Sequence, residues 1–134
     1  MVYEPAEDSQ LLKRNISKYA EGVILDMGTG SGVLAEEAKK YGRVYAADID
    51  KQSIEYCKRN TEGVEFVESD LFSALKRKFD TIIFNPPYLP KDKGIQDKAI
   101  YGGKNGYEVI QRFFEEVRDY MKDDTKILLL FSSL

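Results

Sequence analysis

The sequence contains no histidine and no tryptophan, and Cys57 is the single cysteine among its 134 residues. One thiol and no imidazole leave too few ligands for a structural or catalytic zinc site. The same absence excludes Ser-His-Asp and Cys-His mechanisms, which need an imidazole as the base. A single cysteine also excludes an intrachain disulfide, which favours a reducing compartment. We therefore expect no metal site, and proton handling by carboxylates, backbone or water.

The chain also lacks an excess of positive charge and a long apolar run. Its 20 basic and 23 acidic residues give a net charge of −3. Proteins that hold nucleic acid through general electrostatics normally show a basic excess. No charged-then-apolar leader stands at the N-terminus, and no stretch is apolar for long enough to span a bilayer. These features predict a soluble, cytoplasmic protein with a single domain over residues 1–134.

Predicted strands and helices alternate along the whole sequence. Short runs of β-branched and aromatic residues predict buried strands, and apolar residues at helical spacing predict the helices between them. The predicted strands cover residues 23–27, 43–47, 64–67, 80–84 and 127–131. The predicted helices cover residues 6–19, a segment that begins at 33, residues 52–60 and residues 106–121. This alternation predicts a three-layer αβα fold, with a parallel sheet of five strands between helices.

The same spacing predicts the inward side of each helix. The residues concerned are Leu11, Leu12 and Ile16 in the first helix, Val33, Leu34 and Ala38 in the second, and Ile54, Tyr56 and Cys57 in the third. We expect these side chains to face the sheet. Residues 88–105 carry lysines, aspartates and glycines without periodicity, which predicts a long surface loop.

The tetrapeptide Asn85-Pro86-Pro87-Tyr88 follows the predicted strand 80–84, and in open α/β sheets ligands bind at the carboxyl ends of the strands. Proline lacks a backbone NH and fixes φ, so the proline pair makes a stiff corner whose carbonyls can accept hydrogen bonds. Asn85 adds a side-chain carbonyl and Tyr88 adds a flat apolar face. These groups fit a planar NH2 group on an amide or a base. A rigid turn that stops a strand is the simpler alternative.

A glycine-rich turn at 26–32, Asp-Met-Gly-Thr-Gly-Ser-Gly, leaves the first predicted strand and opens a helix. Glycine permits a close approach of the backbone to a ligand. An acidic residue about twenty positions further on commonly binds ribose hydroxyls, and Asp48 stands there. Gly32 comes one residue early for the dinucleotide fingerprint, which favours a nucleoside without a pyrophosphate. The alternatives are tight packing for the glycines, and a cap or turn role for Asp48 and Asp70.

Together these motifs resemble the class I S-adenosylmethionine-dependent methyltransferases of the N5-glutamine or N6-adenine type. The motifs that carry the resemblance are the glycine turn at 26–32, Asp48, Ser-Asp-Leu at 69–71 and Asn-Pro-Pro-Tyr at 85–88. The opening Val-Tyr-Glu-Pro-Ala-Glu-Asp-Ser at 2–9 narrows it to the HemK-like methyltransferases of eukaryotic and archaeal kind. That family modifies the glutamine of the Gly-Gly-Gln loop in the class 1 translation termination factor. The resemblance covers nearly the whole chain and implies a Rossmann-like methyltransferase sheet.

The resemblance implies S-adenosylmethionine as the cofactor and S-adenosylhomocysteine as its product. It assigns seven residues to the cofactor: Ser9 on its carboxylate side, Asp26 near its amino group, Gly28 and Gly30 against its methionine moiety, Asp48 at its ribose, and Asp70 and Leu71 at its adenine.

The resemblance also assigns the tetrapeptide to the acceptor. Asn85, Pro86, Pro87 and Tyr88 would bind the substrate, and Asn85, Pro86 and Tyr88 are the expected catalytic residues. The Asn85 side chain and the Pro86 carbonyl would accept the two amide protons of the target glutamine, while Tyr88 packs on its plane. Direct transfer of this kind needs an oriented nucleophile and stabilised charge, and no strong base.

Two other functions stay open at this point. An amino-methyltransferase that acts on N6 of adenine, or on another amino group of DNA or RNA, shares the tetrapeptide, although no basic face is evident. A non-catalytic cofactor-binding module is the second alternative.

The resemblance carries two further expectations, about partners and about the C-terminus. Members of the subfamily often pair along the third strand, 64–68, with a small zinc-binding activator protein through strand addition, so we expect a heterodimer. A homodimer through the same edge is the alternative. Class I methyltransferase sheets usually have seven strands, so we expect the C-terminal hairpin to be missing and the chain to be truncated after 127–131.

Overall fold

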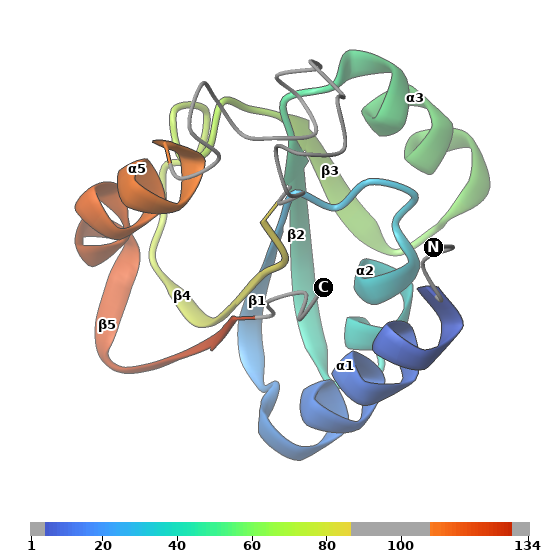
Figure 1. Cartoon of the computed structure of the whole chain (residues 1–134), viewed down its shortest axis with the longest axis horizontal. Coiled ribbons are helices and arrows are strands. Elements are labelled where there is room, and N and C mark those ends of the chain that lie inside the picture. Colours follow the sequence, from blue (N-terminus) through green and yellow to red (C-terminus); the bar gives the residue numbers. More distant parts are fainter. Residues whose placement is uncertain (1–4, 87–107, 130–134) are drawn as a thin grey trace, which may run out of the picture.

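The structure is a computed structural model that describes residues 5–86 and 108–129, with side chains from residue 11 onward. Its elements, in chain order, are α1 (Pro5–Tyr19), β1 (Gly22–Met27), α2 (Val33–Ala38), β2 (Gly42–Asp48), α3 (Lys51–Asn60), β3 (Val64–Glu68), β4 (Phe79–Phe84), α5 (Glu108–Glu116), the 3-10 helix η2 (Val117–Tyr120) and β5 (Met121–Leu129) (Figure 1). The predicted loop 88–105 lies outside the described residues. Within the described ranges, no helix is both long enough and apolar enough to cross a membrane.

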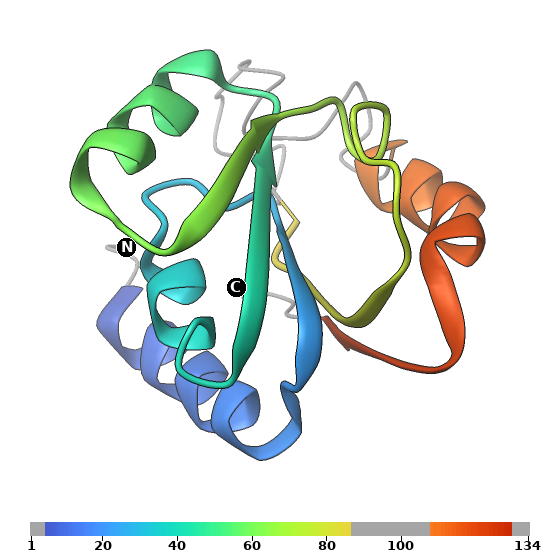
Figure 2. The same cartoon turned by 180° about the vertical axis from the view of Figure 1, so that it is seen from behind.

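The described strands form one sheet in the order β3-β2-β1-β4-β5, and every neighbouring pair is parallel (Figures 1 and 2). The predicted α/β fold with five parallel strands is therefore confirmed. The first four predicted strands are all present, and each is longer by a single residue at one or both ends.

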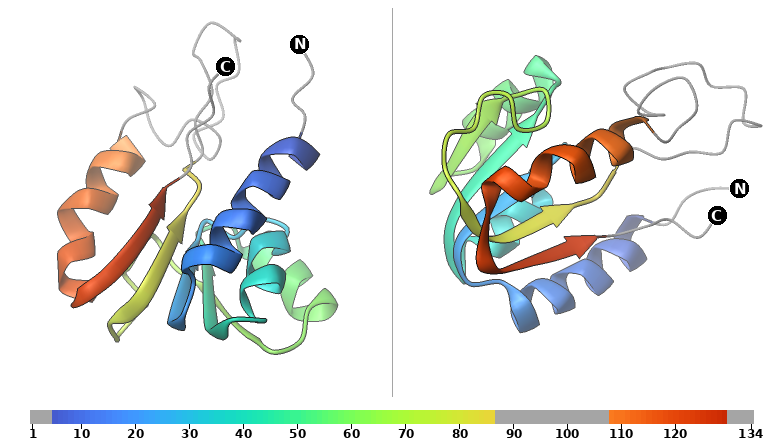
Figure 3. Two further views of the ribbon diagram at one scale, coloured as in Figure 1. Left: turned by 90° about the horizontal axis from the view of Figure 1, so that it is seen from below. Right: turned by 90° about the vertical axis from the view of Figure 1, so that its left-hand side faces the viewer.

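Helices cover both faces of the sheet, as the predicted three layers require. Figure 3 shows α1 and α2 on one side of the sheet and α5 on the other. Adjacent residues of one strand supply the two cores, because successive side chains of a strand point to opposite faces. Ile83 packs in the core beneath α1, α2 and α3, whereas Ile82 packs in the core beneath α5. The result is two apolar layers that fix the sheet between them.

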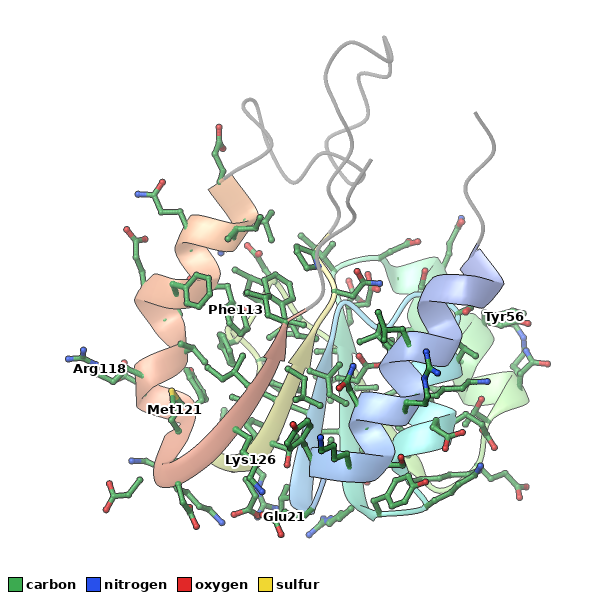
Figure 4. The ribbon with its side chains drawn as sticks, turned by 60° about the horizontal axis from the view of Figure 1, so that its bottom comes forward. Glu21, Tyr56, Phe113, Arg118, Met121 and Lys126 are labelled. Atoms are coloured by element: carbon green, nitrogen blue, oxygen red, sulfur yellow. The ribbon has the colours of Figure 1, made fainter. Side chains whose placement is uncertain are left out.

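An aromatic stack anchors α5 to the sheet. The ring of Phe113 is fully buried and lies against Phe84 at the end of β4, with ring centroids 4.1 Å apart. It also packs against Phe72 at 5.5 Å. Figure 4 shows Phe113 on the side of α5 that faces the strands. This contact holds α5 next to the carboxyl end of β4.

The predicted boundary between the last helix and the last strand is wrong. The α-helix ends at Glu116 and continues as η2, and β5 begins at Met121, six residues before the predicted start. The early part of β5 is polar and pairs irregularly with β4, because the register shifts between Phe79 and Thr81. Thr125 holds this irregularity by donating its hydroxyl to the Phe79 carbonyl at 2.6 Å. An apolar pattern could not predict a strand segment of this kind.

Three side chains predicted to face the sheet are instead exposed: Leu11 by 45%, Val33 by 42% and Tyr56 by 49%. Each helix turns only a narrow stripe inward, and the neighbouring residues occupy it. The residues that do so are Leu12 and Ile16 in α1, Leu34, Ala35 and Ala38 in α2, and Ile54 and Cys57 in α3. Figure 4 shows Tyr56 on the outer side of α3.

Candidate functional site

The carboxyl ends of four neighbouring strands, β3, β2, β1 and β4, lie together. We call this side of the sheet the carboxyl edge, to distinguish it from the outermost strands. Met27 pairs with Ala47 on one side and with Phe84 on the other. Asp48 pairs with Glu68 at the end of the next strand. The predicted site residues at or just beyond these paired ends are Gly28, Asp48, Asp70 and Asn85. The parallel register therefore brings the separate sequence motifs to one edge.

The three glycines of the turn differ in what surrounds them. Gly28, Gly30 and Gly32 have φ values of 78°, 56° and 86°, a region that favours glycine. A Cβ on Gly30 would meet nothing within 4 Å, whereas one on Gly32 would lie 2.9 Å from the Cys57 sulfur. The backbone at Gly30 is therefore open to a ligand, while Gly32 is required for packing against α3.

The carboxylate of Asp48 is held by backbone NH groups on both sides. Gly30 donates to its Oδ2 at 2.9 Å, and Asp50 donates to its Oδ1 at 2.8 Å. A carboxylate oxygen can accept more than one hydrogen bond. Asp48 is thus oriented by the glycine turn and keeps acceptor capacity at the end of β2.

Asp26 is a buried carboxylate with an unsatisfied oxygen. Its side chain is 1% exposed, its Oδ2 accepts the Thr29 hydroxyl at 2.8 Å, and its Oδ1 has no hydrogen-bond partner among the described residues. Burial raises the pKa of Asp26 to about 6; the Thr29 hydroxyl and, more weakly, the nearby Ala35 backbone NH oppose the shift, and the charge of Asp48 adds to it. A buried oxygen without a donor is costly unless a ligand supplies one.

The turn after β3 carries Asp70 and Leu71. The Asp70 side chain is half exposed, whereas Leu71 is buried in the core beneath α5. Leu71 has a φ of 52° and is the one non-glycine residue with positive φ in the part of the chain that the structure describes. Asp70 Oδ1 forms an ion pair with Arg112 of α5 at 3.1 Å.

The first residues of the tetrapeptide lie against the glycine turn. A Cβ on Gly28 would be 3.7 Å from the Asn85 carbonyl oxygen. Asn85 is exposed and Pro86 is buried. Pro87 and Tyr88 lie outside the described residues, and so does the side chain of Ser9 in α1. The predicted acceptor groups are therefore described only for Asn85 and Pro86.

Two residues at this edge were missed by the sequence motifs. Ile49 follows Asp48 directly and is 61% exposed, the largest exposure among the large apolar side chains of the described residues. The sequence signal for Ile49 was an apolar residue directly after Asp48, the predicted ribose-binding residue. Thr29 is buried and donates to Asp26, three residues earlier, a spacing that allows such a local contact.

A comparison with known families identifies this arrangement. The family model described as the methyltransferase small domain matches residues 6–133 of the chain. The chain belongs to this family. It is a methyltransferase, and family membership implies S-adenosylmethionine as its methyl donor. The resemblance drawn from the motifs is confirmed at the level of the family.

Three relatives in the methyltransferase family illustrate the similarity. A protein of Methanocaldococcus jannaschii, provisionally named as a protein N5-glutamine methyltransferase, is 38% identical over 144 residues, which cover 99% of this chain and 73% of that protein. Human methyltransferase HEMK2 is 33% identical over 142 residues, with 90% and 66% covered. The release factor glutamine methyltransferase of Lactococcus lactis is 30% identical over 123 residues. That alignment covers 79% of this chain but only 46% of the bacterial protein.

A solved structure has the same fold and a related sequence. The Mtq2–Trm112 complex of E. cuniculi, described as responsible for methylation of the eRF1 translation termination factor, contains a chain with a TM-score of 0.69 and 33% identity. The match covers 86% of this chain and 68% of that chain. The ribosomal protein L11 methylase of Lactobacillus delbrueckii, at 20% identity and a TM-score of 0.65, shows the fold alone.

Proposed function

We propose that this methyltransferase transfers a methyl group from S-adenosylmethionine to the side-chain amide nitrogen of a glutamine, in the Gly-Gly-Gln loop of a class 1 translation termination factor. The observation that carries the proposal is the proximity of Gly28 to Asn85: a Cβ added at Gly28 would lie 3.7 Å from the Asn85 carbonyl oxygen. It places the open glycine turn beside the first group of the acceptor motif. The relatives named for glutamine or release factor methylation, and the complex described for eRF1, support the acceptor.

The residues at the glycine turn fit the amino-acid part of the cofactor. The unsatisfied Oδ1 of buried Asp26 is suited to the ammonium group, because a charged donor would satisfy it. The open backbone at Gly30, together with the neighbouring Gly28, is suited to the methionine chain. We assign Ser9 to the carboxylate side from its position in the N-terminal motif.

The residues after β2 and β3 fit the nucleoside part. Asp48, oriented by two backbone NH groups, would accept the ribose hydroxyls. Asp70 would accept the amino group of adenine, and the backbone at Leu71 would meet the ring edge, since a carboxylate beside a backbone NH matches an amino group beside a ring nitrogen. Exposed Ile49 would supply an apolar contact for the base.

The acceptor is oriented by hydrogen bonds, because an amide nitrogen is a weak nucleophile. The Asn85 side-chain carbonyl and the Pro86 carbonyl would accept the two protons of the glutamine NH2 group, and Pro87 and Tyr88 would supply the rest of the motif. These acceptors would hold the nitrogen in line and stabilise the positive charge that develops on it. When bound, the cofactor would supply the methyl group: the N–CH3 bond would form as the sulfonium S–CH3 bond breaks, S-adenosylhomocysteine would leave, and the methylated nitrogen would lose one of its two protons to water. No histidine is needed for this step.

We further propose that a small zinc-binding activator subunit pairs with β3, Val64–Glu68. This strand is an outermost strand of the described sheet, and among the described residues it pairs only with β2. An edge strand offers unpaired backbone groups to a partner strand. The Mtq2 structure contains Trm112 as a second subunit, which supports a partner of this kind. The zinc ligands would belong to the partner.

The test of the acceptor is transfer from labelled S-adenosylmethionine by residues 1–134, which we treat as a single methyltransferase domain, with and without a Trm112-type subunit. The acceptors are a termination factor, its Gln→Ala variant in the Gly-Gly-Gln loop, and duplex DNA with an RNA of equal length. We expect label in the first acceptor alone. Label in the Gln→Ala variant or in nucleic acid would overturn the glutamine assignment.

A further inference from the structure

The turn that presents Asp70 is strained, and a buried hydroxyl holds it. Leu71 has a φ of 52°, which a side chain with a Cβ seldom adopts, and such strain persists only where surrounding contacts enforce it. Ser69 is 4% exposed, donates its hydroxyl to the Leu71 carbonyl at 2.6 Å and accepts the Ala74 NH at 3.0 Å. The hydroxyl therefore spans the turn and fixes its two ends.

Ser69 also connects this turn to the neighbouring strand end. Its backbone NH donates to the Asp48 carbonyl at 2.9 Å. With Ser69 and Leu71 both buried, Asp70 between them is directed outward, and its side chain is half exposed. The position of Asp70 relative to Asp48 is thus set from inside the protein.

Arg112 holds the same aspartate from outside. Its guanidinium forms an ion pair with Asp70 Oδ1 at 3.1 Å and a second, longer one with Glu116 at 3.6 Å, one helical turn further on. The next residue, Phe113, is fully buried against Phe84, so α5 cannot shift without disrupting the core. Engagement of Oδ1 restrains the carboxylate and leaves Oδ2 as an acceptor for a ligand.

The ion pair between Arg112 and Asp70 contributes little to folding stability. The Arg112 and Asp70 side chains are 43% and 50% exposed, and exposed pairs contribute little to folding. Loss of this pair should therefore be detectable in ligand binding without loss of the fold.

We propose that Ser69 and Arg112 are positioning residues, which hold the Asp70–Leu71 turn from its buried and its exposed side in the conformation that receives the adenine edge of the cofactor. The inference rests on the assignment of Asp70 and Leu71 to the adenine in the proposed function. It adds Ser69 and Arg112, which are 43 positions apart in the sequence, to the residues that determine recognition of the base.

The test compares binding of S-adenosylhomocysteine with binding of its inosine analogue, in which an oxygen replaces the amino group of the base. The unsubstituted chain of residues 1–134 and its variants Ser69→Ala, Ser69→Thr, Arg112→Gln and Arg112→Lys are titrated by calorimetry. We expect Arg112→Gln to weaken binding of the adenine compound about threefold to fivefold and Ser69→Ala roughly tenfold, with little change for the inosine compound. Ser69→Thr and Arg112→Lys should retain part of the preference for adenine.

Lys126→Gln is the matched control. It removes an ion pair of similar exposure, with Glu21 at 2.8 Å, at the opposite end of the strands (Figure 4). We expect no change in either affinity. Urea unfolding of each variant separates loss of fold from loss of positioning, and the exposed site of Arg112 keeps that variant folded if Ser69→Ala is not.

Three results would overturn the inference: wild type without a preference for adenine over inosine, variants that weaken both compounds equally, or variants that change neither. Its failure is distinct from failure of the proposed function. If wild type binds and discriminates but does not methylate the termination factor, the glutamine assignment fails and the two positioning roles stand.

Discussion

Replacing Asp26 by asparagine should change stability and cofactor affinity in opposite directions at neutral pH. The substitution keeps the shape of the side chain and removes its charge. Burial raises the pKa of Asp26 from 3.8 to about 6, so the ionised form is less stable in the folded chain than in the unfolded one. At about 1.36 kcal/mol for each pKa unit, ionisation costs the fold about 3 kcal/mol.

The sign of the pH dependence follows from the raised pKa. The contribution of Asp26 to stability is fully present below pH 3.8, and it is lost as the pH rises through about 6. Asparagine avoids this loss but buries an NH2 group where Oδ1 now lacks a partner, at a cost of roughly 1–2 kcal/mol. Asp26→Asn should therefore be less stable than wild type at pH 4 and more stable by about 1–2 kcal/mol at pH 8.

The assay is urea unfolding from pH 4 to pH 8, with Asp123→Asn as a control at an exposed position of β5. The control should leave the pH profile unchanged. Calorimetry with S-adenosylhomocysteine at pH 8 should show at least a tenfold weaker affinity for Asp26→Asn, because the ammonium group loses a charged acceptor. Parallel pH profiles for wild type and Asp26→Asn would refute the reasoning about the buried charge.

Three further variants test other parts of the site and the fold. Asn85→Ala should abolish transfer to glutamine in a radiolabel assay while the Kd for S-adenosylhomocysteine changes less than about threefold, and equal loss of both would contradict its acceptor role. Gly30→Ala should cost roughly 1 kcal/mol in urea unfolding and weaken cofactor binding, whereas Gly32→Ala should cost more and be partly rescued by Cys57→Ala, an effect that additive costs would disprove. Thr81→Val should lose about 1–3 kcal/mol of unfolding free energy, since the buried hydroxyl both accepts from and donates to the backbone before β1, and an unchanged midpoint would count against that role.

The sequence predicted the parallel sheet and the edge on which the site lies, because both depend on local patterns. Each motif follows an apolar run, and parallel pairing then brings the motifs together without further information. Gly28 and Asn85 are 57 positions apart in the sequence. They are brought together because Gly28 follows Met27, Asn85 follows Phe84, and Met27 pairs with Phe84. The same apolar runs therefore predict both the strands and the position of the site at their carboxyl ends.

Contacts between distant side chains were not predictable in this way. The pairing of Asp70 with Arg112 depends on where Phe113 anchors α5, and no local pattern encodes that position. Tyr56, predicted inward with Ile54 and Cys57, is exposed because it lies two residues from Ile54 and one from Cys57, whereas residues of one helix face are three or four apart. Apolar character alone did not distinguish the buried stripe from its neighbours.

Two residues near the carboxyl ends of the strands each have a feature that costs folding free energy. Asp26 is buried with an unsatisfied oxygen and a raised pKa, and Leu71 is held in a left-handed conformation. An apolar residue at 26 would remove the first cost, whereas Leu71 offsets part of the second by burying its side chain in the core beneath α5. In the proposed function the Asp26 carboxylate receives the ammonium group and the Asp70–Leu71 turn receives the base, so both costs fall on groups proposed to bind S-adenosylmethionine.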